Sequence, residues 1–183
     1  TIERVNSNPA RFDMKKLENI NGDKIRALTL NDFYTWSLPF LQRAKVVSTP
    51  ISSEQERVVR LALPIIQERI VKLAEIPAML NFLFVKNFKV EGDEMGKIVD
   101  ADSQNVLKVA LTKLEPVQSW DHVAIESVLR VALIEELGLK PRIAFSALRI
   151  AVTGSHISPP LFESLELLGK ERSIARIKAA ISN

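Results

Sequence analysis

Residues 149–183 read RIAVTGSHISPPLFESLELLGKERSIARIKAAISN, and this stretch decides the fold. Gly154 is placed to end one helix. The Ser158-Pro159 pair is placed to begin the next, because a serine oxygen can accept from free backbone amides and proline has no amide to leave unsatisfied. Gly169 should stop that helix before a final one. Each of the two helices has an apolar row at helical spacing: Leu161, Leu165 and Leu168, then Ile174, Ile177 and Ile181.

The same helical periodicity runs through the rest of the chain. It predicts four helices. The first is capped by Ser53, is kinked or split at Pro64 and passes Arg69; the second covers residues 103–114. The third is capped by Ser119, runs through Glu136 and is closed by Gly138, and the fourth begins at Pro141. Residues 82–90 contain β-favouring residues but no partner hairpin. The sequence therefore predicts an all-α fold.

Two boundaries divide the chain. Residues 1–27 mix turn formers with one short helix and cannot close a core alone, so we expect them to be loosely held. The segment from Glu91 to Gly96 is polar, acidic and rich in glycine, which is typical of a hinge. We therefore expect two small helical bundles in tandem, at residues 28–92 and 93–183.

Composition narrows the class of protein. The chain has 183 residues, of which 46% are hydrophobic, enough for a real core. It has no apolar run long enough for a membrane span and no secretory signal, so we expect no membrane partner. With no cysteine there is no disulfide or thiolate site, and a reducing cytoplasm fits.

Positive charge gathers at one end. From Gly138 onward there are seven basic and three acidic residues, whereas the preceding 137 residues carry a net charge of −1. Such concentration suits a phosphate-bearing partner, although a solvated pair of helices would look the same. The candidate phosphate contacts lie on the terminal helix, which is predicted to carry its basic side chains outside the apolar row: Lys170, Arg172, Arg176 and Lys178.

Catalytic and metal-binding patterns are missing from the sequence. His122 and His156 share no motif and have no partner at ligand spacing. The glycines form no phosphate-binding loop. The acidic pairs Glu135-Glu136 and Asp100/Asp102 have no neighbour that would raise a pKa for acid–base work. The sequence predicts a binding protein with no catalytic residue, metal site or cofactor of its own.

Two anchors at opposite ends of the chain resemble one family. Near the start stands NPARFDMKKLENINGDKIR, residues 8–26, and near the end stands the RIAVTGSHISPPLF run with LLGKER after it. In this order and spacing they resemble the C-terminal part of glutamyl-tRNA synthetases, which are class I aminoacyl-tRNA synthetases. One departure is Asn19, where many members have tryptophan.

The resemblance implies the anticodon-binding region of a glutamate–tRNA ligase. Residues 1–27 would be a remnant of the stem-contacting region, and the two bundles would hold the anticodon loop of tRNA(Glu). The chain would be inactive alone, because its partner, the catalytic half of the same polypeptide, supplies the sites for ATP and Mg. The alternative is a helical protein–protein interaction module, or a free-standing paralogue without RNA binding.

The resemblance also implies which residues read the anticodon. Arg69, in QERIVKLAEIP, aligns with an arginine that reads the third anticodon base, and Arg149 with one that contacts the first base. Ser158, Pro159 and Leu161 align with a loop that lies against the bases, and a proline corner followed by leucine would give a rigid apolar ledge for stacking. Each residue also has a structural interpretation. Arg69 could form an ion pair with Glu68 or with a neighbour of Lys72, and Arg149 a salt bridge to a helix end. Pro159 could simply begin a helix, and Leu161 could belong to the core.

The chemistry of these residue types fits the role. Proteins read RNA sequence mostly on single-stranded loops, where base edges are free to hydrogen-bond. The guanidinium of Arg has planar, fixed donors that lysine cannot copy. Glutamate and glutamine anticodons differ at the third base, C against G, and C presents two acceptors that Arg69 can favour.

Overall fold

The computed structural model describes residues 13–181, and within that range every regular element is a helix. The α-helices are α1 (Met14–Arg26), α2 (Leu30–Arg43), α3 (Ser53–Gln67), α4 (Ile76–Leu80), α5 (Gly92–Gly96), α6 (Ala101–Leu114), α7 (His122–Arg130), α8 (Pro141–Thr153), α9 (Leu161–Leu168) and α10 (Lys170–Ile181). Two 3-10 turns, η2 (Leu73–Glu75) and η3 (Asn81–Leu83), flank α4, and a π-helical segment, η4 (Val131–Glu136), continues α7. The all-α prediction is confirmed.

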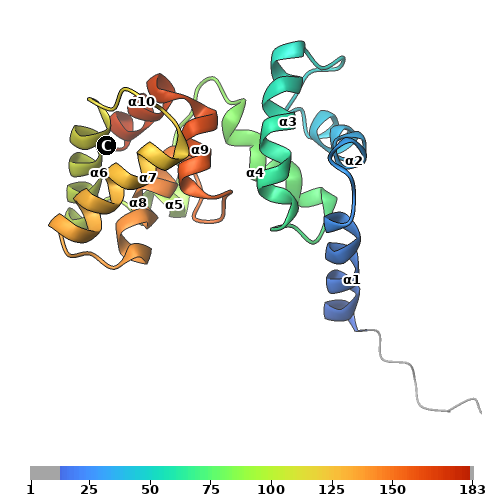
Figure 1. Cartoon of the computed structure of the whole chain (residues 1–183), viewed down its shortest axis with the longest axis horizontal. Coiled ribbons are helices and arrows are strands. Elements are labelled where there is room, and N and C mark those ends of the chain that lie inside the picture. The colour runs from blue at the N-terminus through green and yellow to red at the C-terminus, as the bar shows by residue number, and fades with distance from the viewer. Residues whose placement is uncertain (1–12, 182–183) are drawn as a thin grey trace, which may run out of the picture.

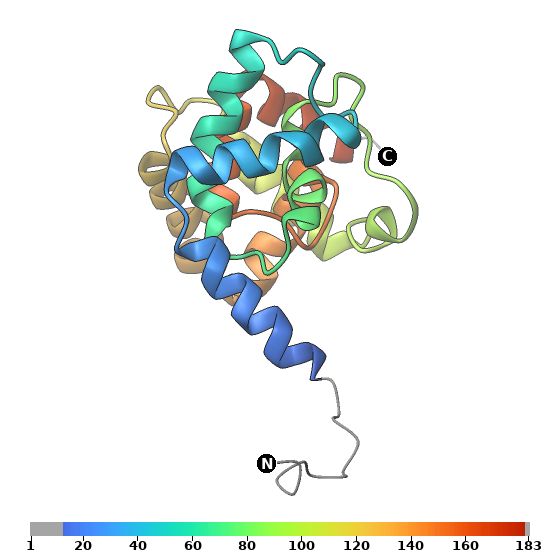
Figure 2. The same cartoon turned by 90° about the vertical axis from the view of Figure 1, so that its right-hand side faces the viewer.

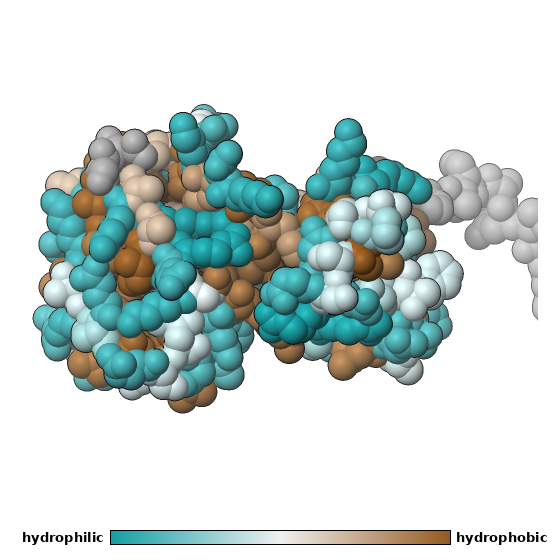
Figure 3. Space-filling model, turned by 90° about the horizontal axis from the view of Figure 1, so that it is seen from above, coloured by the Kyte–Doolittle hydropathy of each residue, from teal (hydrophilic) through white to brown (hydrophobic). Residues whose placement is uncertain are grey.

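The helices form two groups joined by residues 84–91 (Figure 1). We call residues 14–83, with α1 to α4, the first lobe, and residues 92–181, with α5 to α10, the second lobe. In the first lobe α2 packs on α3; in the second, α6 packs on α7, α8 and α10. The lobes touch where α3 meets α9 and where η3 meets α8, and from above they appear as two rounded bodies with a narrower waist (Figure 3). This arrangement fits two tandem bundles, and the boundary at residues 92 and 93 stays a prediction.

Helix α3 begins and ends earlier than the sequence predicts. Its N-cap is Ser52, not Ser53, because Ser52 and Gln55 form a reciprocal capping box in which each side chain accepts from the other's backbone amide. The helix ends at Gln67, so the prediction that it passes Arg69 is wrong. Arg69 instead lies in the turn after the helix, where its exposed side chain is free of the helical register.

The cap of α7 is also displaced, from Ser119 to Asp121. The Asp121 carboxylate accepts from the amide of Ala124, while the Ser119 hydroxyl donates to Asp121 at 2.5 Å. A carboxylate is the stronger acceptor for a helix N-terminus, so the serine supports the cap without forming it. Gly138, at φ +66°, follows η4 in the left-handed conformation that the sequence predicts for it.

Helix α1 runs through the Asn21-Gly22 pair that resembles a turn in the sequence. Its second half packs on the rest of the first lobe: Ile25 is buried, and the buried amide of Gln67 donates to the carbonyls of Ile25 and Leu28. Gly22 permits this approach, because a Cβ there would meet a methyl of Val71 at 3.2 Å. The first half of α1 extends away from the other helices (Figure 2), and residues 1–12 of the predicted loosely held segment lie outside the described residues.

The two C-terminal helices follow their predicted pattern only in part. Leu161, Leu165 and Leu168 of α9 are buried as predicted, and Gly169 ends the helix at φ +83°. Helix α10 buries a different face from the predicted one. Ile177 is buried as predicted, but the other buried residues are Ser173, Arg176 and Ala180, and Ile174 and Ile181 are only partly buried. The prediction that Arg176 lies outside the apolar row is therefore wrong. Along residues 13–181 no helix is both long and apolar enough to cross a membrane.

Candidate nucleic-acid interface

Arg149 is the best-held of the predicted site residues. It lies one turn before the end of α8, half-buried, and its Nη1 donates to Ser158 Oγ at 2.9 Å and to the Pro159 carbonyl at 2.8 Å. Within the described residues its Nε and Nη2 make no hydrogen bond, and no carboxylate forms an ion pair with it. One edge of the guanidinium therefore holds the loop while the other can donate to a ligand.

The loop that Arg149 holds, residues 154–160, differs from its prediction. Ser158 does not cap α9: its hydroxyl accepts from Arg149 and donates to the Pro159 carbonyl, and Pro160 occupies the cap position without a side-chain hydrogen bond. Pro159 is buried and Leu161 is only 3% exposed. The predicted stacking ledge of these two residues is therefore wrong, because neither has free surface; they fix the shape of the loop instead.

The apolar surface that the loop does offer is Ile157, which is 63% exposed. Next to it, His156 is also exposed. Sequence reasoning missed Ile157 because its neighbours Pro159 and Leu161 carry the family motif, whereas an isolated isoleucine in a turn has no signal of its own. The structure makes Ile157 the candidate for stacking against a base.

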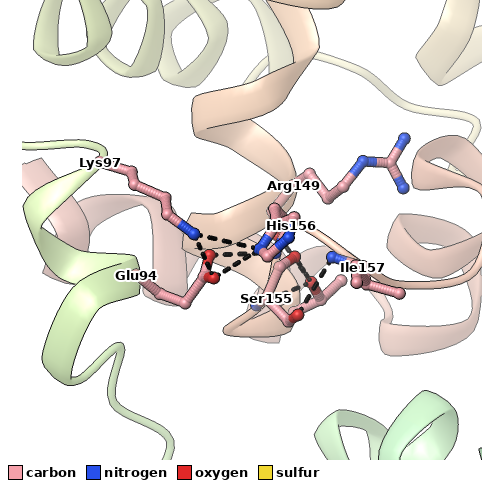
Figure 4. Close-up of polar contacts among 7 residues, drawn as sticks. Glu94, Lys97, Arg149, Ser155, His156 and Ile157 are labelled. Carbon is pink, nitrogen blue, oxygen red and sulfur yellow. Dashed lines mark hydrogen bonds and ion pairs between the residues drawn. The ribbon is translucent and has the colours of Figure 1, made fainter.

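A second helix holds the loop from the other side. Glu94 of α5 accepts from the His156 backbone amide at 3.0 Å, and its Oε1 lies 2.5 Å from His156 Nδ1 and 2.6 Å from Lys97 Nζ (Figure 4). Burial raises the pKa of Glu94, but the hydrogen bonds from Lys97 and His156 outweigh it and lower the pKa overall. The acidic segment predicted as a hinge therefore forms a short helix that clasps the loop.

Arg69 and Arg149 act on each other although they come from different lobes. Burial lowers the pKa of Arg149, the positive charge of Arg69 lowers it further, and Glu163 opposes the shift. The ion pair of Arg69 with Glu68 that the sequence left open does not form among the described residues. The side chain of Arg149 extends away from the Glu94 cluster (Figure 4). The charge of Arg69 therefore acts on Arg149, and within the described residues each guanidinium keeps donors that make no hydrogen bond.

The basic residues of α10 have varied surroundings. Lys170 Nζ donates to the Val117 carbonyl at 2.7 Å, and Lys178 pairs with Glu115 at 2.7 Å. Both lie within the second lobe. Arg172 is exposed and reaches across to the end of the first lobe, whereas Arg176 is buried, at 6% exposure. Arg176 is therefore removed from the set of candidate phosphate contacts.

A groove of about 770 Å³ runs between the lobes, beside α3 and α9. Its charged lining includes Arg57, Glu163, Glu166, His122 and Arg172, and the rest of its lining is mostly apolar. One oxygen of Glu163 is buried without a hydrogen-bond partner. No group of three or more His, Asp or Glu residues in the described part of the chain could hold a metal ion.

The site is therefore a surface of a helical fold on which two arginines, Arg69 and Arg149, form no ion pair within residues 13–181. The chain belongs to the anticodon binding domain family, which matches residues 32–181. It is 46% identical over 182 residues to the glutamate–tRNA ligase of Nocardioides sp., covering 98% of this chain and 37% of that protein. It is 47% identical over 176 residues to the glutamate–tRNA ligase of Leifsonia xyli, covering 94% and 36%.

The fold is also that of solved structures. A glutamate tRNA ligase from Elizabethkingia meningosepticum superimposes with a TM-score of 0.71 at 18% identity, over 100% of this chain and 35% of that one. These comparisons confirm the resemblance to glutamyl-tRNA synthetases that the two sequence anchors indicate. The chain spans little more than a third of the length of the relatives it matches.

Proposed function

We propose that this chain is the anticodon-recognising region of a glutamate–tRNA ligase and binds the anticodon loop of tRNA(Glu). In the whole protein, which would work in the cytoplasm, it would position the tRNA while a catalytic half uses ATP and Mg to attach glutamate. Arg69 would read the third anticodon base and Arg149 the first. The observation that carries the proposal is that residues 32–181 match an anticodon binding domain, in which both guanidinium groups keep donors without a partner among the described residues.

Each arginine suits its assigned base in a different way. Arg149 is held by Ser158 and Pro159, so its free edge is already oriented for a base edge. Arg69 is exposed at the turn after α3, where it can approach the ring nitrogen and carbonyl of a third-position C. A G at that position presents donors on the same edge, so a charged donor would be left unpaired, at a cost of about 1–3 kcal/mol.

The surrounding residues would support the bases and the phosphates. Ile157 offers an apolar face for stacking, and Ser158, Pro159 and Leu161 keep the loop in shape. Lys170 and Lys178 remain candidates for phosphate contacts, whereas the guanidinium of Arg172 is already held by the carbonyls of Leu83 and Val85. Electrostatic contacts of this kind make binding salt-dependent, with a slope of roughly −0.7 per neutralised phosphate on a single strand.

The test is a titration of the chain with anticodon stem-loops that carry C or G at the third position, at two salt concentrations. We expect tighter binding to C, and an affinity that falls as salt rises. Arg69→Gln should reduce the preference for C, whereas Arg57→Gln, a matched change on α3, should leave it intact. Binding that is undetectable, or insensitive to salt, would favour the protein–protein interaction module instead.

A further inference from the structure

The two arginines of α10 nearest the first lobe have no acidic partner within the described residues. Arg172 Nη1 donates to the Leu83 carbonyl at 2.8 Å and its Nη2 to the Val85 carbonyl at 3.3 Å. Arg176 Nη2 donates to the Phe82 carbonyl at 2.7 Å and its Nη1 to the Val152 carbonyl at 2.5 Å. All four acceptors are backbone carbonyls, which is unusual for cations that could instead face solvent or a phosphate.

These acceptors lie where the lobes join. Phe82 and Leu83 form the end of the first lobe, Val85 begins the connection, and Val152 belongs to α8 of the second lobe. The Arg176 guanidinium also stacks on the ring of Phe88, 3.7 Å from its centroid. Helix α10 of the second lobe therefore makes hydrogen bonds to the last turn of the first lobe and to the start of the connection.

The burial of Arg176 shows how firmly this contact is built. Burial, with a smaller contribution from Arg172, lowers the pKa of Arg176 to about 9, so the group still carries its charge at neutral pH. A buried charge is tolerated only when hydrogen bonds replace its hydration. The carbonyls of Phe82 and Val152 and the face of Phe88 provide that replacement, and they do so only when the two lobes have this relative orientation.

We propose that Arg172 and Arg176 are positioning residues that fix the orientation of the two lobes, and with it the separation of the two base-reading arginines. The inference rests on the proposed function of Arg69 and Arg149. Arg69 follows α3 of the first lobe, whereas Arg149 lies on α8, one turn before the Val152 carbonyl that Arg176 holds. Weakening the hydrogen bonds from α10 to the first lobe therefore lets Arg69 move relative to Arg149.

The first measurement is made without RNA. The chain has no cysteine, so Ala78→Cys on α4 and Ala101→Cys on α6, both exposed, can carry a pair of spin labels that report the distance between lobes. We expect Arg172→Ala and Arg176→Lys to broaden the distance distribution, and Arg172→Lys to restore it in part by returning one hydrogen bond. Lys170→Ala removes the same charge from the same helix, but its contact is inside the second lobe, so it should leave the distance unchanged.

The second measurement compares binding of the C and G stem-loops over a range of salt. Arg172→Ala should lower the preference for C about threefold or more while the salt slope stays that of the parent chain. If Arg172 instead contacted a phosphate, its loss would reduce the slope by about 0.7 and lower both affinities alike. An unchanged distance distribution, or a broadened one with an intact preference for C, would overturn the inference.

The two proposals fail separately. If the parent chain binds neither stem-loop, the proposed function fails, while the distance measurement still shows whether α10 fixes the lobes. If the parent chain prefers C and Arg172→Ala keeps both the distance and the preference, the proposed function stands and the positioning role is refuted. Arg172 lies at the surface, so its variant tests the idea even if the buried Arg176 variant does not fold.

Discussion

The hydrogen bonds of Glu94, which we call the clasp between α5 and the loop at residues 154–160, give the sharpest prediction of stability. Glu94→Gln keeps an oxygen for the His156 amide but removes the charge. Hydrogen bonds to charged groups contribute about 1.5–3 kcal/mol and neutral ones about 0.5–1.5, so the exchange weakens this bond by about 1 kcal/mol. The ion pair with Lys97 and the hydrogen bond with the His156 ring add only a few tenths, since those side chains are 45% and 54% exposed. We expect a total loss of about 1–1.5 kcal/mol.

Urea unfolding measures this loss, and its pH dependence tests the cause. The folded pKa of Glu94 is lowered, so its contribution is present above the unfolded pKa of about 4.3 and disappears as pH falls through the folded value. The difference between the parent chain and Glu94→Gln should therefore be full at pH 7 and shrink below about pH 4. Amide exchange at residues 155–157 should rise in the variant at neutral pH.

Asp93→Asn is the matched control, because it removes the same charge from the exposed neighbour on the same helix. Its effect on the unfolding free energy should stay within about 0.5 kcal/mol. Equal losses for the two variants would show that net charge, and not the clasp, is responsible. A Glu94→Gln difference that is the same at pH 3 and pH 7 would also refute the reasoning.

Two further predictions concern local geometry. Gly154→Ala should lower the unfolding free energy by more than about 1 kcal/mol, because Gly154 has a φ of +78° and a Cβ there would lie 3.3 Å from the Phe88 ring. Gly96→Ala is the control: Gly96 has open space around it and no positive φ, so this change should be neutral or slightly stabilising. Equal effects of the two changes in thermal unfolding would contradict the prediction. The Glu166 hydrogen bond raises the pKa of His122, so this contact stabilises the fold below pH 6.5 and is lost as pH rises through the folded pKa. Glu166→Gln should lower the His122 pKa in an NMR titration, and an unmoved pKa would exclude the contact.

The parts of the fold that sequence predicts well are those set by neighbouring residues. Pro141 opens α8, and Gly154 and Gly169 follow helices at positive φ, because each requirement is a property of a single backbone position. The sequence does not select the capping residue where several polar residues stand together. Ser52, and not Ser53, caps α3 because its hydroxyl and the Gln55 side chain each accept from the other's backbone amide, and the presence of two serines does not reveal this pair.

The candidate site was predictable in its residues and much less in their contacts. Arg149 and Arg69 follow from the family anchors, yet the hydrogen bonds of Arg149 to the loop decide which of its edges is free. The sequence predicts a hinge around Glu94 because the partner of this residue, His156, is 62 residues away. Hydrophobic periodicity predicts that Arg176 lies outside the apolar row, because it treats charged side chains as exposed and contains no information on the buried carbonyls of Phe82 and Val152 that need a donor.

Arg69 and Arg149 differ in how freely they can change during evolution. Arg149 holds the loop at residues 154–160 and, in the proposed function, also contacts a base, so most replacements would disturb the fold together with recognition. Arg69 makes no side-chain hydrogen bond or ion pair within the described residues, and the helix before it ends without its help. A substitution at Arg69 could therefore rewrite which third base is accepted while leaving the scaffold intact, making this turn the place where specificity can diverge between related proteins.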